Sequence, residues 1–353
     1  MAFGLASHFT KPEPNKARAF RPSRSRHITT ADPLFLIIPI HVDDGLAITN
    51  SPSLYQWFVC EISKTIEFVC LGPVLNTRYL GQRIIRNRSN KTLQISQSDL
   101  IVALIDEWGL ADCKTSSVPL HHNPSNLPPC SPNACPEIPD DKILPSYQRL
   151  VGSLTYLAIC TRPDIAYAAM ALGQFNSSPT RAHLNCAKGV LRYLAGSVSL
   201  CLQFPSIHRP SLHSPNLPQH SSTCALSDAD WASDEKDRKS VSGYCFFFLD
   251  CLVSWSSRKQ RTVSTSSTES EYYALTNTFK EALWLKALNF SYTLPFFPFC
   301  TPFPFSVTTK VHASLRSRTL FPLELNISTS AITSFANTLL MVLLICSGSL
   351  RLI

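Results

Sequence analysis

The chain has 353 residues, of which 44% are hydrophobic, and its formal net charge is +8. This length is enough for two domains with cores of their own, and this composition excludes a chain that is disordered throughout. The positive charge favours a polyanionic partner, nucleic acid or an anionic membrane, although a modest basic excess is also common without one. None of the thirteen cysteines forms a CxxC pair, so we expect no zinc site but reduced thiols in an intracellular protein of the cytoplasm or nucleus.

The N-terminal third is predicted to alternate short strands and helices. Residues 1–31 contain Pro12, Pro14 and Pro22 among basic residues, which favours a disordered leader over a transit peptide or a polyanion-binding arm. An apolar run, the tight turn Asp43-Asp44-Gly45 and a second apolar run predict a β-hairpin over residues 34–49. Beyond it we expect a helix over 53–68, strands over 72–85 and 92–96, and a helix over 98–108 capped by Ser96 or Ser98.

The rest of the chain is predicted to be helical first and sheet-rich later. A proline-rich loop over 119–145 precedes helices that begin at Tyr147, at Arg162-Pro163-Asp164 and at Arg181. A linker over 204–222 leads to strands over 224–230, 243–249, 251–255 and 262–265, and to a helix over 267–288 capped by Thr268. After residue 290 no period persists, so this tail is interpreted as unrelated sequence or a changed reading frame.

Two short acidic motifs are candidates for metal binding. Asp43-Asp44 follows an apolar strand, and Ser227-Asp228-Ala229-Asp230-Trp231 is followed later by Glu269 and Glu271. Adjacent carboxylates at a strand end are a common way to hold Mg²⁺ for phosphoryl transfer. Only Glu13 and Asp32 are acidic before Asp43, and no aspartate follows Asp250, so both sites are expected to be incomplete. By its residues alone, Asp43-Asp44-Gly45 favours a polar hairpin turn over a metal site.

Several motifs occur in an order that resembles the C-terminal part of the Ty1/copia class of retrotransposon polyprotein over residues 32–288. They are Val42-Asp43-Asp44, Tyr79-Leu80-Gly81, Leu150-Val151-Gly152-Ser153-Leu154, Thr161-Arg162-Pro163-Asp164-Ile165, Val190-Leu191-Arg192-Tyr193-Leu194, Ser227-Asp228-Ala229-Asp230-Trp231, Asp237-Arg238-Lys239-Ser240 and Ser267-Thr268-Glu269-Ser270-Glu271. The resemblance implies an α+β fold, with a partial reverse-transcriptase palm and thumb-connection followed by an incomplete RNase H-like α/β domain.

The predicted domains follow from this resemblance and from the shifts in composition. They are a basic leader (1–31), a palm remnant (32–120), a proline-rich loop (121–146), a helical connection (147–200), a linker (201–223), a truncated RNase H-like domain (224–289) and a low-pattern apolar tail (290–353).

The resemblance also implies the site residues. Asp43 and Asp44 match polymerase carboxylates, and Asp228 and Glu271 match RNase H carboxylates, which would bind Mg²⁺ or Mn²⁺ as vestigial catalytic residues. We expect Asp230, Asp234 and Glu269 to be solvated or capping residues, and Tyr79, Tyr193 and Trp231 to be core aromatics. Basic residues expected along a primer–template duplex are Arg78, Arg83, Arg86, Arg88, Lys188, Arg192, Arg238, Lys239, Arg258, Lys259 and Arg261.

The functional prediction is a fragment of reverse transcriptase and RNase H that is catalytically inactive alone and binds nucleic acid without sequence preference. Its expected partners are an RNA/DNA hybrid or DNA primer–template and an intact retroelement polyprotein, whereas a membrane is not expected. Two alternatives stay open: activity with carboxylates from a partner chain, and a non-enzymatic interaction or membrane-associated protein that uses the apolar tail.

Overall fold

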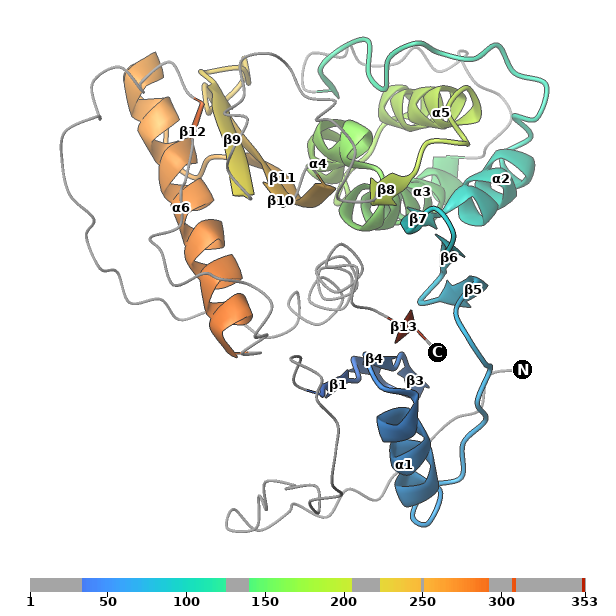
Figure 1. Ribbon diagram of the computed structural model, residues 1–353. Coiled ribbons are helices and arrows are strands. Elements are labelled where there is room, and N and C mark those ends of the chain that lie inside the picture. Colours follow the sequence, from blue (N-terminus) through green and yellow to red (C-terminus); the bar gives the residue numbers. More distant parts are fainter. Residues whose placement is uncertain are drawn as a thin grey trace, which may run out of the picture. The chain divides into compact units, whose positions relative to one another are not determined.

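The computed structural model describes residues 34–124, 140–204, 223–248, 251–291, 307–308 and 351–352, which form a mixture of helices and small sheets (Figure 1). They belong to two compact units whose main boundary lies between Pro73 and Val74. The predicted leader and most of the predicted proline-rich loop, linker and tail lie outside the described residues.

The first unit contains the acidic hairpin, one helix and the last described strand. Its elements are β1 (Leu36–Ile37), β2 (Ile40–His41), β3 (Asp44–Gly45), β4 (Ile48–Thr49), α1 (Pro52–Ile62) and β13 (Arg351–Leu352). The hairpin is confirmed, but the predicted turn is wrong by one residue. His41 pairs with Asp44, so the turn consists of Val42 and Asp43. Val42 has φ 57°, a conformation that is rare for a β-branched residue.

Helix α1 begins where the sequence supplies helix-start signals. Pro52 occupies the first turn, and the Ser51 hydroxyl accepts a hydrogen bond from the Leu54 N–H at 3.3 Å. The helix ends at Ile62, so the predicted end at residue 68 is wrong. Arg351 and Leu352, which belong to the predicted low-pattern tail, form β13 and pair with β4.

The second unit begins with an antiparallel sheet in the order β5-β6-β7-β8. Its strands are β5 (Asn76–Tyr79), β6 (Gln82–Asn87), β7 (Thr92–Ser96) and β8 (Leu202–Phe204). The strand over 92–96 is confirmed, but the single strand predicted over 72–85 is wrong. Leu80 and Gly81, with φ 48° and 67°, form a turn between two strands. Residues 202–204 were predicted as linker, yet buried Leu202 and Phe204 pair with β7.

Helices follow the first strands of this sheet and form most of the core. They are α2 (Ser98–Glu107), α3 (Asp140–Cys160), the 3₁₀ helix η2 (Pro163–Ile165), α4 (Ala166–Gly173) and α5 (Arg181–Ala195). The α2 cap position belongs to Gln97, so neither predicted serine occupies it. The Ser96 hydroxyl nevertheless accepts from the Ser98 N–H, the first of the helix, at 3.1 Å. Helix α3 begins inside the predicted loop and contains Pro145. Ile143 and Tyr147 are both buried, and their burial outweighs the hydrogen bond that the proline removes.

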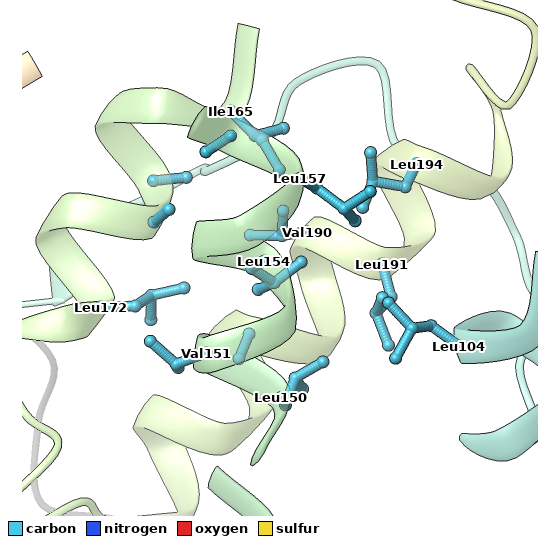
Figure 2. Packing of buried hydrophobic residues seen from close by; sticks show 14 of the residues in the cluster. Leu104, Leu150, Val151, Leu154, Leu157, Ile165, Leu172, Val190, Leu191 and Leu194 are labelled. Carbon is cyan, nitrogen blue, oxygen red and sulfur yellow. The ribbon is translucent and has the colours of Figure 1, made fainter. Parts of the chain in front are cut away.

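The helical core is built from leucines and valines at helical spacing. Leu150, Leu154 and Leu157 of α3 point toward α4 and α5 (Figure 2). The Tyr147 hydroxyl donates to the Leu172 carbonyl oxygen at 2.7 Å, which satisfies a polar group inside this core.

The last sheet has the strand order β11-β10-β9-β12. Its elements are β9 (Thr223–Asp230), β10 (Val241–Phe248), β11 (Cys251–Lys259), α6 (Ser267–Ser291) and β12 (Val307–Thr308). Strand β12 pairs with β9 in parallel, although residues 307–308 belong to the segment that was predicted to be a low-pattern tail unrelated to this domain.

The segment before α6 is a helix cap and not the strand predicted over residues 262–265. The Ser266 hydroxyl accepts from the Glu269 N–H at 3.1 Å, so the predicted Thr268 cap is wrong. The Glu269 carboxylate accepts from the Thr265 N–H at 2.6 Å, which confirms the capping role expected of Glu269.

We predict that Gly81→Ala destabilises the protein by about 1–2 kcal/mol, because alanine is strained at positive φ. A Cβ atom at this position would also lie 3.1 Å from the Tyr156 hydroxyl oxygen. Unfolding in urea measures the change. Gly152→Ala in α3, where an added Cβ meets nothing within 4 Å, is the control and should stabilise by about 0.5–1 kcal/mol. A wild-type midpoint for Gly81→Ala would contradict the account of this turn.

Candidate functional site

The predicted polymerase carboxylates lie at the tip of the hairpin in the first unit. Asp43 occupies the turn and Asp44 begins β3, and both side chains are exposed. Val42 beside them is 80% exposed. The pair is therefore accessible to solvent, as either a metal site or a polar turn requires.

The predicted RNase H carboxylates occupy different elements of the second unit. The Ser227 hydroxyl accepts from the Thr278 hydroxyl of α6 at 2.9 Å, so Ser227 faces that helix. Because side chains alternate along a strand, Asp228 points to the opposite face of the sheet, where it is exposed. Glu271 is a buried residue of α6 itself.

A two-metal site needs several carboxylates around each ion. Within the described ranges, no group of three or more His, Cys, Asp or Glu side chains could hold a metal ion. The described residues therefore do not fit a complete Mg²⁺ or Mn²⁺ site.

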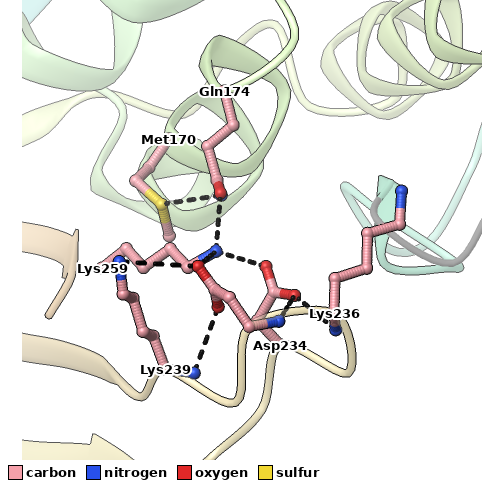
Figure 3. A network of polar contacts seen from close by, with 7 residues as sticks. Met170, Gln174, Asp234, Lys236, Lys239 and Lys259 are labelled. Carbon is pink, nitrogen blue, oxygen red and sulfur yellow. Dashed lines mark hydrogen bonds and ion pairs between the residues drawn. The ribbon is translucent and has the colours of Figure 1, made fainter. Parts of the chain in front are cut away.

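Asp234 was expected to be a solvated or capping residue. It is buried rather than solvated, and it caps the following turn by accepting from the Lys236 and Asp237 N–H groups. Its carboxylate is buried and accepts from Lys259 Nζ at 2.5 Å, while its other oxygen accepts from the Lys236 N–H at 2.9 Å (Figure 3). Lys259 Nζ also donates to Gln174 Oε1 at 3.0 Å and lies 3.0 Å from Asp237. Burial alone would lower the pKa of Lys259, but the two aspartates outweigh it and raise that pKa. Asp230, by contrast, is exposed as expected.

The structure brings two of the predicted nucleic-acid-binding residues together. Arg78 and Arg83 are directly opposite one another on β5 and β6, and both bind Asp99 Oδ2, at 2.6 and 3.0 Å. Burial favours a higher pKa for Asp99, but the two guanidinium groups outweigh it and lower that pKa. Since one carboxylate balances one charge at most, the arginine pair keeps a net positive charge. Arg86 follows on the same hairpin, where burial and the charge of Arg88 lower its pKa to about 10.

The other predicted basic residues are spread over the second unit. Lys188 lies over the Trp108 ring at 5.5 Å, and Arg192 on the same helix is half-buried. Arg238, Arg258 and Arg261 are exposed, whereas Lys239 lies 3.7 Å from Asp237. Lys239 and Lys259 therefore meet around one carboxylate, and the structure does not gather the whole set on one surface.

The three aromatic residues predicted for the core lie closer to the surface. Tyr79 and Tyr193 are half-buried, and Trp231 is exposed, so the prediction for Trp231 is wrong. Its indole N–H donates to the Ser264 carbonyl oxygen at 3.1 Å.

A buried polar cluster around Arg162 was missed by sequence reasoning. The Arg162 side chain is 1% exposed and binds the Asp164 carboxylate at 2.7 Å. It also donates to the carbonyl and hydroxyl oxygens of Ser197, at 3.0 and 2.7 Å, and the Tyr193 hydroxyl donates to Asp164 at 2.8 Å. Burial raises the pKa of Asp164, but Arg162 and Tyr193 outweigh it and lower that pKa. The available signal was Arg162-Pro163-Asp164, which was interpreted as a helix start and as part of a family motif but not as a buried ion pair.

The sequence also gave no indication of a cleft of about 650 Å³ in the second unit. Pro163, Asp164, Ala166 and Tyr167 line one side of it, and residues of β9, β10 and β11, among them Asp228, line the other. Of the predicted metal ligands, Asp228 is therefore the one that borders this cleft.

Comparisons with known proteins place the chain among transposon proteins. It is 34% identical over 255 residues to the retrovirus-related Pol polyprotein from transposon TNT 1-94 of Nicotiana tabacum, which covers 71% of the chain and 18% of the polyprotein. It is 34% identical to the uncharacterized mitochondrial protein AtMg00810 of Arabidopsis thaliana, over 70% of the chain and 93% of that protein. It is 30% identical to the putative transposon Ty5-1 protein YCL074W of Saccharomyces cerevisiae, over 72% of the chain and 75% of that protein.

The chain belongs to the family of retrovirus-related Pol polyproteins of copia-type transposons. Membership of this Pol family confirms the retrotransposon part of the predicted resemblance, while the reverse transcriptase and RNase H parts stay predictions. The chain spans 18% of the length of the tobacco polyprotein, so it matches a portion of that Pol protein. No protein-family model matches the chain, and no solved structure matches it.

Two further predictions concern disulfides and membranes. Eight cysteines of the described residues form no disulfide bond: Cys60, Cys70, Cys113, Cys160, Cys186, Cys201, Cys245 and Cys251. In the part of this Pol-family chain that the structure describes, no helix has the length and apolar character needed to span a bilayer.

We predict that Asp164→Asn destabilises the protein by about 3 kcal/mol near neutral pH, because it leaves the Arg162 charge buried without its carboxylate. The pKa of Asp164 is lower in the folded than in the unfolded state, so its contribution is complete above the unfolded pKa of about 4. The contribution is lost as pH falls through the folded pKa. The difference between wild type and variant should therefore narrow in acid.

Urea unfolding between about pH 3 and pH 7 measures this difference across the carboxyl titration range. Asp106→Asn removes an exposed carboxylate of α2 and should change stability by no more than about 0.5 kcal/mol at any pH. A constant difference between wild type and Asp164→Asn across this range would show that Asp164 is not linked to folding in this way.

Proposed function

We propose that this chain is a reverse transcriptase- and RNase H-derived region of a copia-type Pol polyprotein that binds nucleic acid without catalysing nucleotide transfer or RNA cleavage by itself. The β5–β6 hairpin carries the binding proposal. Arg78 and Arg83 stand side by side there on one face. Arg86 lies on the opposite face of β6, because side chains alternate along a strand, and exposed Arg88 follows the end of β6. Contacts with backbone phosphates require surface positive charge and no complete active site.

The last sheet supports the RNase H-like part of the proposal. Strands β9, β10 and β11 are antiparallel, whereas β12 lies parallel to β9 on its other side. Helix α6 lies between β11 and β12 in the sequence, and its Thr278 contacts Ser227 of β9. Neighbouring parallel strands require a crossover connection, usually a helix. This arrangement supports the α/β fold that the resemblance implies for residues 224–289, and β12 adds to it a strand from beyond those residues.

The positions of the carboxylates support the absence of catalysis. Asp43 and Asp44 are exposed at a hairpin tip, Asp228 borders the cleft and Glu271 is buried in α6. No three acidic or other metal-binding side chains of the described residues form a candidate site. Two-metal chemistry by this chain would therefore need carboxylates from a partner, such as an intact retroelement polyprotein.

We predict that Arg78→Gln/Arg83→Gln weakens binding of an RNA/DNA hybrid and reduces the slope of log affinity against log salt by about 1 or more. Each phosphate contact that is lost releases one counterion fewer, and Asp99 already balances part of the pair's charge. Fluorescence anisotropy at several salt concentrations measures the slope. The effect should be the same for hybrids of different sequence.

The matched control is Lys142→Gln/Lys280→Gln, which removes the same formal charge from exposed positions on α3 and α6. It should leave the salt slope close to that of wild type. Equal losses in the two double variants would indicate attraction by net charge alone and would refute a hairpin interface.

We also predict no extension of a labelled primer on an RNA template, and no cleavage of that template, with Mg²⁺ or Mn²⁺. Gel analysis of both reactions tests this, with an active reverse transcriptase as the positive control. Metal-dependent extension that Asp43→Ala abolishes, or cleavage that Asp228→Ala abolishes, would overturn the proposed lack of catalysis. Nucleic-acid binding would remain testable by itself.

A further inference from the structure

The cleft beside Asp228 has the size and composition of a small-molecule site. Its volume of about 650 Å³ lies within the range of roughly 300–1,000 Å³ that is usual for ligand pockets. The sheet formed by β9, β10 and β11 provides the floor, and Pro163 and Tyr167 contribute to the opposite side. Both sides belong to the second unit.

Strand register arranges the floor in two rows. Leu226, Cys245 and Trp255 are direct cross-strand neighbours and form an apolar row. The Trp255 indole N–H donates to the Ala158 carbonyl oxygen at 2.7 Å, which fixes the orientation of its ring. The floor thus presents a rigid aromatic and aliphatic surface to the cleft.

The second row is polar and contains a gap. Asp228, Gly243 and Ser257 are direct cross-strand neighbours, so a residue without a side chain separates the carboxylate from the hydroxyl. Gly243 does not have positive φ, and the nearest atom to an added Cβ would be the Ser256 carbonyl oxygen at an ordinary 3.7 Å. Its backbone therefore does not require glycine. Glycine inside a strand often marks a place where a ligand approaches closely.

The charged residues that line the cleft are negative. Asp164 and Asp228 are among the lining residues, and none of the described lining residues is Lys, Arg or His. Asp164 already binds Arg162, which leaves exposed Asp228 as the carboxylate for a ligand. Burial raises the pKa of Tyr167, and the negative charges of Asp230 and Asp234 raise it further. Asp234 is paired with Lys259, so exposed Asp230 is the carboxylate that adds negative charge beside Tyr167.

We propose that this cleft binds a planar organic cation. Its flat apolar body would lie on the row formed by Leu226, Cys245 and Trp255, and its positive group would enter the gap at Gly243 and bind Asp228. Aromatic faces and a carboxylate both attract such a cation, whereas the phosphates of nucleic acid would be repelled. The site is therefore separate from the arginine-bearing hairpin of the proposed function.

The test compares two probes of the same shape by isothermal titration calorimetry on the full chain. Naphthamidine carries a positive amidinium group, and naphthamide is its neutral isostere. We expect the cation to bind at least about tenfold more tightly, because it alone forms a charge-assisted hydrogen bond with Asp228. Asp228→Asn should reduce the affinity for naphthamidine to that of naphthamide, and Asp106→Asn, which removes an exposed charge on α2, should not.

A second variant tests the gap without altering charge. Gly243→Val places a strand-favouring side chain where the probe would lie and should abolish binding of both probes. If this variant does not fold, Gly243→Ala should still weaken both probes. Three results would each overturn the proposal. They are equal affinities of wild type for the two probes, wild-type affinity in both the Asp228→Asn and the Gly243→Ala variant, and no binding to wild type at about 1 mM probe. None of these results depends on the hybrid-binding measurement.

Discussion

The arrangement of the second unit depends on the contacts of one buried group, the guanidinium of Arg162. A buried charge is costly unless its donors are satisfied, and Arg162 binds the Asp164 carboxylate and both oxygens of Ser197. Because Ser197 follows α5 and Asp164 lies in η2, one side chain joins the end of α5 to the beginning of α4. The same contacts fix the position of Asp164, which lines the cleft. The ion pair that stabilises the helical core therefore also holds one side of the cleft in place.

A second polar network relates helix α4 to the last sheet. Lys259 at the end of β11 reaches Gln174 directly after α4 and the buried carboxylate of Asp234. The Lys236 ammonium lies 5.8 Å from the centre of the Phe175 ring, which adds a cation–π contact between the same regions. Lys259 was expected to meet nucleic acid. Its charge is instead paired with aspartates inside the protein, which removes Lys259 from the proposed nucleic-acid surface.

The sequence predicted those elements whose apolar spacing agrees with their burial. Strand β7 and helix α5 are examples, because their buried residues recur at periods of two and of three to four. It failed where one local feature outweighed the pattern. Leu80-Gly81 turns the chain inside an apparently continuous strand, and Pro145 is retained within α3 by the buried residues around it. Thr265 was assigned to a strand, although its N–H donates to the Glu269 carboxylate at the beginning of α6.

Some of the candidate sites could be predicted from the sequence, and others could not. Asp43, Asp44 and Asp228 could be singled out because adjacent acids and strand ends are visible in the sequence. The cleft could not, since it depends on cross-strand register and on the approach of α4 to the opposite side. The gap at Gly243 has meaning only when Asp228 and Ser257 are known to be its neighbours.

The surroundings of Asp228 also distinguish between the kinds of cation that it can hold. Mg²⁺ gives up its water reluctantly and needs several oxygen ligands at fixed angles, and the described residues supply no such group. An organic cation needs one carboxylate for its charge and gains from apolar surface for its body, and Asp228 lies in the row next to Leu226, Cys245 and Trp255. A carboxylate that lacks the partners for metal catalysis therefore remains suited to a softer, larger cation.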